Sequence, residues 1–555
     1  MTLQQKPEFR RELLDYIVRH RPVDATFIGL HERDYFLPDL SEAGIQNTLT
    51  ALGQLRKTIL QTPPSRDPGE QLDRQLIEGF LDIQQWELQS DHSYWGNPSC
   101  YTGEAIFGVL GLLLASFAPR EERLKAAIGR LQSIPEFLAQ GCRNLRVFPP
   151  AWAKRALKEV IGSTLFLREG IPLLEVEASS RDRLRAAARK ALRAFEDFGN
   201  FLEAAGPPRS EPTYGCGREA LELLLRKGHF LHLLGFDGDS ILAYAKEEFE
   251  LARQRLRRQA SHLGGDPQQL LRQLTSLHPS AEDYYSRYTE IWNETRQLAV
   301  RRQLLTWPDF RIRYAPRPGW ARSAAPYLYF LFYRSPAAFG APLPHEYLVE
   351  PLETGFLQEE QQRVLEAHND SVIKLNHVIH HGGIGHHVQN WHALRSPSLV
   401  GRIAAVDCAS RIALFCGGTM AEGWACYATD LMSEFGALSP LEQLAECQSR
   451  VRMCARATVD VSLHQGRMTL EEAARFYQLH VGMTATAAES EAVKNSMFPA
   501  TGLMYLMGSD AIHRLRGEIS QARGSSFRLD HFHDEFLSFG SIPVALIRER
   551  MLAAG

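Results

Sequence analysis

Apolar residues recur at three- and four-residue spacing through long stretches of this chain, which is the pattern of amphipathic α-helices. The spacing is clearest in the segments 180–205, 217–234, 279–305 and 441–463. Strand signals are clearest at 310–315 and 327–333, where aromatic and β-branched residues cluster between proline-containing turns. The pattern predicts a mainly α protein, a large helical body with a small β element.

A pair of adjacent prolines marks a predicted boundary along the chain. The Pro207-Pro208 loop separates a predicted N-terminal helical region, residues 1–205, from a helical region of residues 206–555 that holds every chemical motif. A boundary in the strand region near 306–345 is the alternative, and a single continuous helical body is another.

Composition narrows the class of protein. The chain has 555 residues, 44% of them hydrophobic and 23% charged, with a formal net charge of −3. These values fit a folded globular protein and give no basic field for nucleic acid. The N-terminus lacks the apolar core of a secretion signal, and no run of about eighteen apolar residues occurs. We expect no nucleic-acid or membrane partner and a cytoplasmic location.

The cysteines argue against one kind of metal site. All eight are scattered without a C-x-x-C pair, which fits reduced thiols better than a disulfide framework or a thiolate-bound metal.

Histidine is concentrated in one short segment. Six of the 20 histidines lie between His377 and His392, and imidazole is the commonest protein ligand for transition metals. The standard zincin spacing fails, since the residue four after His380 is Ile384. His387 shares a helical face with His380 but lies roughly 10.5 Å further along an unbroken helix.

Three glycines change that estimate. Gly382, Gly383 and Gly385 allow a bulge or kink through which His386 or His387 could fold back towards His380. His377 and His381 are spaced as i and i+4, so they form a second candidate pair. Helix capping, buried hydrogen bonding and a metal-free proton relay are the alternatives to metal ligation.

Further candidate residues lie downstream. Glu422 stands in an otherwise apolar run and is the candidate third ligand, with an exposed helix position as the alternative. Arg456, Asp460 and His464 recur every four residues and share a helix face, either as a network that orients ligands or binds a substrate carboxylate, or as a surface salt-bridge ladder. Tyr505 is the candidate polar contact to substrate.

These motifs resemble a known family, the bacterial domain of unknown function 885. Its signature is similar to H-E-A-x-P-G-H-H-x-Q, then E-G-W-A-x-Y, R-x-x-x-D-x-x-x-H and a late Pro-to-Tyr-Gly segment. The matching segments here begin at His380, Glu422, Arg456 and Pro499. The resemblance spans nearly the whole chain. It implies a helical zincin-like architecture, similar to oligopeptidases and carboxypeptidases of that group, with a metal, zinc as first guess, on His380, His386 (or His387) and Glu422.

The chain departs from the family pattern at the catalytic point. His381 replaces the glutamate that is expected to act as base, and Ile384 replaces the proline. Losing one general base usually forfeits about 10²–10⁴-fold in rate. His381 could serve as an alternative base or join the metal as an added ligand, and a more histidine-rich site would suit iron.

The expected function is a metal-dependent enzyme that hydrolyses an amide or peptide bond, or one repurposed for a related carbonyl-activating biosynthetic step. A non-catalytic metal-binding pseudopeptidase and an iron-dependent redox enzyme are the alternatives. We expect a peptide or small-molecule substrate, with a homodimer as one option for assembly. The roles assigned are catalytic for His381, Tyr505 and His464, substrate-binding for Arg456, Tyr427 and His387, and metal-ligating for His380, His386 and Glu422.

Overall fold

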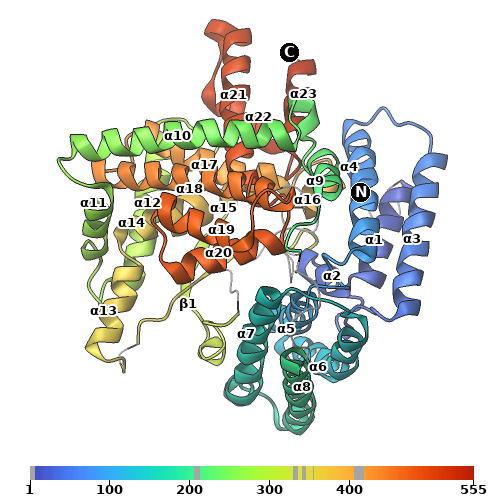
Figure 1. The fold of residues 1–555 in the computed structure, drawn as a ribbon. Helices are drawn as coiled ribbons and strands as arrows, with labels where there is room; N and C mark the ends of the chain where they lie inside the picture. The colour runs from blue at the N-terminus through green and yellow to red at the C-terminus, as the bar shows by residue number, and fades with distance from the viewer. Residues whose placement is uncertain are drawn as a thin grey trace.

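A computed structural model describes residues 7–204, 213–328, 335–340, 345–353, 355–404 and 418–554. Throughout these residues the chain is dominated by helices, and their strands form one small sheet of two parallel strands (Figure 1). The prediction of a mainly α protein with a small β element is confirmed. No helix in the described part of the chain has the length and apolar character needed to cross a bilayer.

Two groups of helices form the N-terminal part. The first group is α1 (Glu8–His20), α2 (Pro22–Ile28), α3 (Glu42–Gln61) and α4 (Pro68–Gln89). The second is α5 (Ser99–Leu114), α6 (Arg120–Asn144), α7 (Pro150–Leu165), the π-helix η2 (Phe166–Gly170), the short η3 (Ile171–Leu173) and α8 (Ala178–Ala204). The second group builds its own apolar core and lies at the bottom of Figure 1.

The middle of the chain leads from helices into the sheet. The helices are α9 (Arg218–Leu223), η4 (Leu224–Gly228), η5 (Leu231–Leu234), α10 (Gly238–His262), α11 (Pro267–Gln273), η6 (Leu274–Ser276) and α12 (Tyr284–Arg301). Strand β1 (Ile312–Pro316) then pairs in parallel with β2 (His345–Val349), with the short helix η7 (Gly319–Ala321) between them in sequence.

The two strand predictions have different outcomes. The segment 310–315 is confirmed with a small shift, because it overlaps β1. The prediction at 327–333 is wrong for Tyr327 and Leu328, which lie in a turn and a bend, and its remaining residues lie outside the described part of the chain. The second strand is His345–Val349, a five-residue strand in which Tyr347 and Val349 are buried.

The C-terminal part supplies the helices that carry the predicted site. They are α13 (Gln358–Ala367), α14 (Asp370–Val372), the π-helix η8 (Ile373–Gly382), α15 (His386–Ala393), α16 (Leu399–Ile403), α17 (Gly418–Glu434), α18 (Pro440–His464), α19 (Leu470–Phe476), η9 (Tyr477–Val481), α20 (Ala485–Met497), α21 (Met504–Arg523), η10 (Gly524–Ser526), α22 (Leu529–Ser538) and α23 (Val544–Ala554). Helices α10 and α18 lie side by side through the centre of Figure 1.

The largest apolar core joins the two ends of the chain. Phe9 and Leu55 from the N-terminal helices belong to the same buried cluster as Trp424, Phe536 and Leu546 from the C-terminal helices. The first helices therefore pack against the part of the molecule that carries α17. The division at residue 205 stays a prediction.

Candidate metal centre

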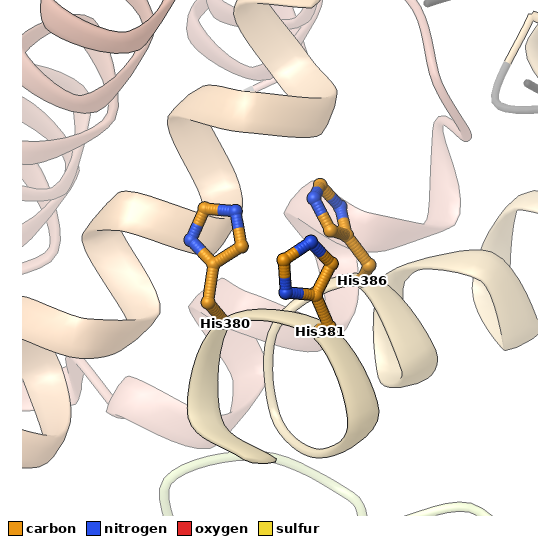
Figure 2. Close-up of side chains that lie close together, drawn as sticks. All are labelled: His380, His381 and His386. Atoms are coloured by element: carbon orange, nitrogen blue, oxygen red, sulfur yellow. The ribbon is translucent and has the colours of Figure 1, made fainter. Parts of the chain in front are cut away.

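His380 and His381 lie in the last turn of η8, a π-helix rather than an α-helix. A π-helix has a wider turn than the 3.6-residue periodicity assumed from sequence, and such turns are frequent at functional sites. The wider turn lets two consecutive side chains face the same space, and Figure 2 shows both rings on one side of the chain.

The glycine-rich turn after η8 reverses the chain so that α15 begins at His386. The Gly385 amide donates to the carbonyl of Ile379 at 2.9 Å. A side chain at Gly385 would place its Cβ 2.0 Å from the carbonyl oxygen of His380, so no larger residue fits. This confirms the prediction that the glycines bring a later histidine back towards His380.

The turn gathers three imidazoles. One ring nitrogen from each of His380, His381 and His386 lies within 4.8 Å of the other two. The ring centroid of His380 lies 4.6 Å from that of His381 and 4.9 Å from that of His386. All three rings point into one space between the helices in Figure 2.

Glu422, in the second turn of α17, completes the cluster. Its Oε2 lies 3.2 Å from Nε2 of His380 and 3.7 Å from Nε2 of His386, and its side chain is 12% exposed. This buried oxygen accepts a hydrogen bond from no residue that the structure describes. A buried carboxylate oxygen without a hydrogen bond is costly unless a cation compensates it. The carboxylate and the imidazoles therefore fit a bound metal ion.

The electrostatics of the cluster favour metal binding over protonation. Burial lowers the pKa of His380, and it lowers the pKa of His381 to well below the usual value, so both rings are neutral. Burial also raises the pKa of Glu422, but the two facing imidazoles outweigh that effect and hold its pKa well below the usual range. Neutral imidazoles around an ionised carboxylate are the protonation states that a divalent cation requires.

Hydrogen bonds fix two of the rings. Nδ1 of His381 donates to the carbonyl of Asn376 at 2.7 Å, and Nδ1 of His386 donates to Oε1 of Gln389 at 3.1 Å. The Gln389 amide in turn donates to Oγ of Ser541 at 2.7 Å, which sets which end of the amide faces His386. Both neutral rings then carry their lone pair on Nε2. Metal-ligating histidines are oriented in this way.

His387 and His377 lie outside the centre. Nε2 of His387 donates to the carbonyl of Phe310 at 2.8 Å, and its buried ring stacks on that residue at 4.3 Å. His377 is buried with Nδ1 2.6 Å from the hydroxyl of Tyr347. The geometry thus favours His386 over His387 as a ligand, and it does not bring His377 into the group with His381. The substrate-binding role predicted for His387 finds no support in this position.

Tyr427 and His464, two other predicted site residues, are also buried away from the imidazoles. The Tyr427 hydroxyl donates to Nε2 of His533 at 2.7 Å. His464 accepts from the amide of Cys216 at 3.1 Å and donates to the carbonyl of Asn495 at 3.0 Å, so both its ring nitrogens serve the backbone. These contacts fit structural positions better than the predicted substrate-binding and catalytic roles.

The helix face of Arg456, Asp460 and His464 is not a surface salt-bridge ladder. Asp460 and His464 are fully buried, and the Arg456 side chain is 17% exposed. Arg456 donates from Nε to Oε1 of Glu491 at 2.6 Å and lies over the ring of Tyr505. Arg456 also lowers the pKa of His380, so its charge acts on the metal centre.

Sequence reasoning missed three neighbours of the centre. Gln389 could have been found, since it stands three residues after His386 and so shares its helix face. Glu491 and Lys494 on α20 left no sequence signal, because their relation to Arg456 and Glu422 is made by packing between distant helices.

The molecule is thus a helical protein with a partly buried cluster of three imidazoles and one carboxylate. The chain belongs to the family described as bacterial protein of unknown function (DUF885), whose model matches residues 22–551. No curated protein matches it.

Two solved structures share the fold. One, described as a "putative lipoprotein of unknown function" from Shewanella oneidensis, is 22% identical with a TM-score of 0.77, and the match covers 100% of both chains. The other, described as a "putative lipoprotein" from Colwellia psychrerythraea, is 17% identical with a TM-score of 0.75 and 99% coverage of both. At these identities the likeness concerns the fold alone.

Proposed function

We propose that this protein is a metal-dependent enzyme of zincin-like ancestry that acts on an amide or peptide bond, or on a related carbonyl group. The observation that carries the proposal is the buried Oε2 of Glu422, which faces two imidazole nitrogens and accepts no hydrogen bond from a described residue. A cation between these groups removes the cost of that burial.

The donor set fits zinc, with His380, His386 and Glu422 as its ligands. When bound, zinc would polarise a carbonyl oxygen and make water more acidic. The chain supplies orientation: Gln389 holds the ring of His386, and the carbonyl of Asn376 holds His381 with its lone pair on Nε2. His381 can accept a proton at that atom, which is the task of the glutamate in the family motif.

Metal analysis of the purified protein tests the proposal. We expect one transition-metal ion per chain, and we expect His380→Ala and His386→Ala to lose it. His262→Ala is the control, because His262 is an exposed histidine at the end of α10 and should leave the metal content unchanged. Absence of a stoichiometric metal, or full retention in His380→Ala, would refute the proposal.

A non-catalytic metal-binding protein is the second candidate, favoured by the position of His381. Its ring nitrogen lies within 4.8 Å of those of His380 and His386, and four protein ligands would close a tetrahedral zinc site. With iron, the same four ligands leave two of six positions open and favour redox chemistry.

A His381→Glu variant separates these functions. Peptide cleavage by the native protein assigns His381 as the base. Cleavage only by His381→Glu indicates that the native chain has been diverted from hydrolysis. Iron in the metal analysis moves the proposal to a redox enzyme. A cobalt-substituted protein adds a spectroscopic test, since loss of His381 changes the visible bands only when it is a ligand.

We retain the cytoplasm as the proposed location. Fractionation of the source cells tests it, and recovery in the membrane fraction would overturn it.

A further inference from the structure

The guanidinium of Arg456 has an edge that faces no protein acceptor. Its Nε donates to Glu491, whereas Nη1 and Nη2 donate to no residue within the described part of the chain. The side chain is 17% exposed, so this edge is open to a ligand from solvent. An arginine edge with two parallel N–H groups matches the two oxygens of a carboxylate.

The same guanidinium is held in a fixed plane. Its central carbon lies 4.9 Å from the centre of the Tyr505 ring, and the bond to Glu491 anchors one end. Stacking on an aromatic ring and pairing with a carboxylate together restrict an arginine far more than either contact alone. The site is therefore organised before any ligand arrives.

Tyr505 places this group next to the metal centre. It lies in the first turn of α21, and α21 crosses α17 where Gly423 and Gly508 meet. A Cβ on Gly423 would lie 2.6 Å from the backbone of Gly508, so the two helices touch at the residue that follows Glu422. Tyr505 lies three residues before Gly508, so Arg456 stacks beside the turn of α21 that touches α17 next to Glu422.

Lys494 adds a second positive charge. It lies one turn after Glu491 on α20, and burial followed by the charge of Arg456 lowers its pKa, while Glu491 and Glu422 raise it. The charge of Glu491 acts on both Arg456 and Lys494. A bound anion would be attracted by the same two cations.

The geometry points to a subsite in which a substrate carboxylate binds Nη1 and Nη2 of Arg456, with Lys494 supplying further attraction, beside the reacting group at the metal centre. The inference deepens the proposed function, because it names the substrate class: molecules that carry a carboxylate near the bond or carbonyl to be attacked. The carboxylate can be the C-terminus of a peptide or that of a small amino acid.

Calorimetric titration of the protein as purified tests the subsite, with three probes: N-acetyl-dialanine, its C-terminal amide and free alanine. We expect N-acetyl-dialanine to bind about tenfold or more tightly than its amide, and Arg456→Gln to abolish that preference. Binding of alanine with the same dependence on Arg456, and no preference between the peptides, would assign the carboxylate to a small amino acid instead.

Arg450→Gln is the matched control. Arg450 lies on the same helix, is 18% exposed and is paired with Asp510 and Glu248, so its removal disturbs a comparable ion pair away from the subsite. We expect this variant to keep the preference for the free acid. Equal binding of acid and amide with no binding of alanine, no binding of any probe, or a preference that survives in Arg456→Gln each overturns the inference.

The metal content of the same samples separates the two proposals. A preference for the acid in protein without metal supports the subsite and contradicts the metal centre. A stoichiometric metal without that preference, and without alanine binding, supports the metal centre and contradicts the subsite.

Discussion

Two buried pairs of imidazole and carboxylate in this protein have opposite characters. Oδ1 of Asp460 lies 3.5 Å from Nε2 of His464, and Oε2 of Glu422 lies 3.2 Å from Nε2 of His380. The pairs are alike in distance and residue type, but the side chains of Asp460 and His464 are fully buried, whereas those of Glu422 and His380 are 12% and 18% exposed. They differ in what else contacts them, and that difference separates a structural junction from a candidate site.

The Asp460 pair is fully hydrogen-bonded to backbone. The carboxylate accepts from the amides of Ala500, Gly502 and Leu503 at 3.0, 2.7 and 3.1 Å. It therefore holds the turn between α20 and α21 in place, while His464 bonds to backbone on both sides. The Glu422 carboxylate has no such amide donors among the described residues. Polar groups that are buried for stability have hydrogen-bond partners in the protein, whereas groups that bind a ligand can lack such partners in its absence.

The largest effect should come from breaking the pair of Asp460 and His464, which is fully hydrogen-bonded to backbone. Asp460→Ala leaves three buried amides without an acceptor, and we expect the free energy of unfolding to fall by about 3–5 kcal/mol. Urea unfolding measures the change. Glu422→Ala is the contrasting variant, and its metal-free form should lose much less, because no backbone donor depends on that carboxylate. Equal losses in the two variants would erase the distinction between the pairs.

The second-largest effect should come from the pair of His380 and Glu422, whose buried oxygen lacks a hydrogen bond from the described residues. Glu422→Gln keeps the shape of the side chain but removes its charge, and we expect the affinity for the bound metal to fall by about 100-fold or more. Competition with a chelator measures the affinity. Glu434→Gln, on the same helix but paired with Arg516, is the control and should bind metal normally. Unchanged affinity in Glu422→Gln would mean that the carboxylate is not a ligand.

The sequence predicted those features of this protein that depend on residues close together along the chain. The apolar spacing predicted the helices at 180–205 and 441–463. The first buries one face along its length, and the second is buried on nearly every side from Val451 onwards. The concentration of histidines and the lone carboxylate at Glu422 pointed to groups that the structure brings together, with Glu422 within 3.7 Å of His380 and His386. Composition and spacing sufficed there.

What sequence could not decide depends on backbone geometry and on distant packing. The choice between His386 and His387 is made by the turn through Gly383 and Gly385, and the π-helical geometry of η8 changes which residues share a face. Strand β2 was missed because five residues that begin with His345 and Glu346 give too short an alternation to recognise.

A smaller effect should come from the residue that orients one ligand. Gln389→Leu removes the acceptor for Nδ1 of His386, and losses of this kind usually weaken metal binding by about 10–100-fold. The chelator competition applies here too. Ser541→Ala, which only frees the far end of the Gln389 amide, should show the same effect at smaller size. A larger loss in Ser541→Ala than in Gln389→Leu would contradict this order.

The smallest effect is the pH dependence of stability that comes from the pair of Asp460 and His464. Burial lowers the pKa of His464 to about 4, from about 6.5 in an unfolded chain. Its contribution to stability is therefore complete above pH 6.5 and is lost as the pH falls towards 4, by up to about 2 kcal/mol at pH 5. Burial raises the pKa of Asp460 to about 7, and this opposes the effect, because stability from that group is lost as the pH rises towards 7. The two contributions to the pH dependence of the free energy of unfolding therefore partly cancel in the native protein.

His464→Gln isolates one of these contributions. A glutamine can still accept from Cys216 and donate to Asn495, but it does not titrate. Relative to the native protein, the variant should therefore gain about 2 kcal/mol between pH 7.5 and pH 5, whatever its stability at neutral pH. Urea unfolding at the two pH values measures the difference. A difference that stays constant with pH would show that His464 is protonated to the same extent in the folded and unfolded chains, and thus that its two backbone contacts do not hold it neutral.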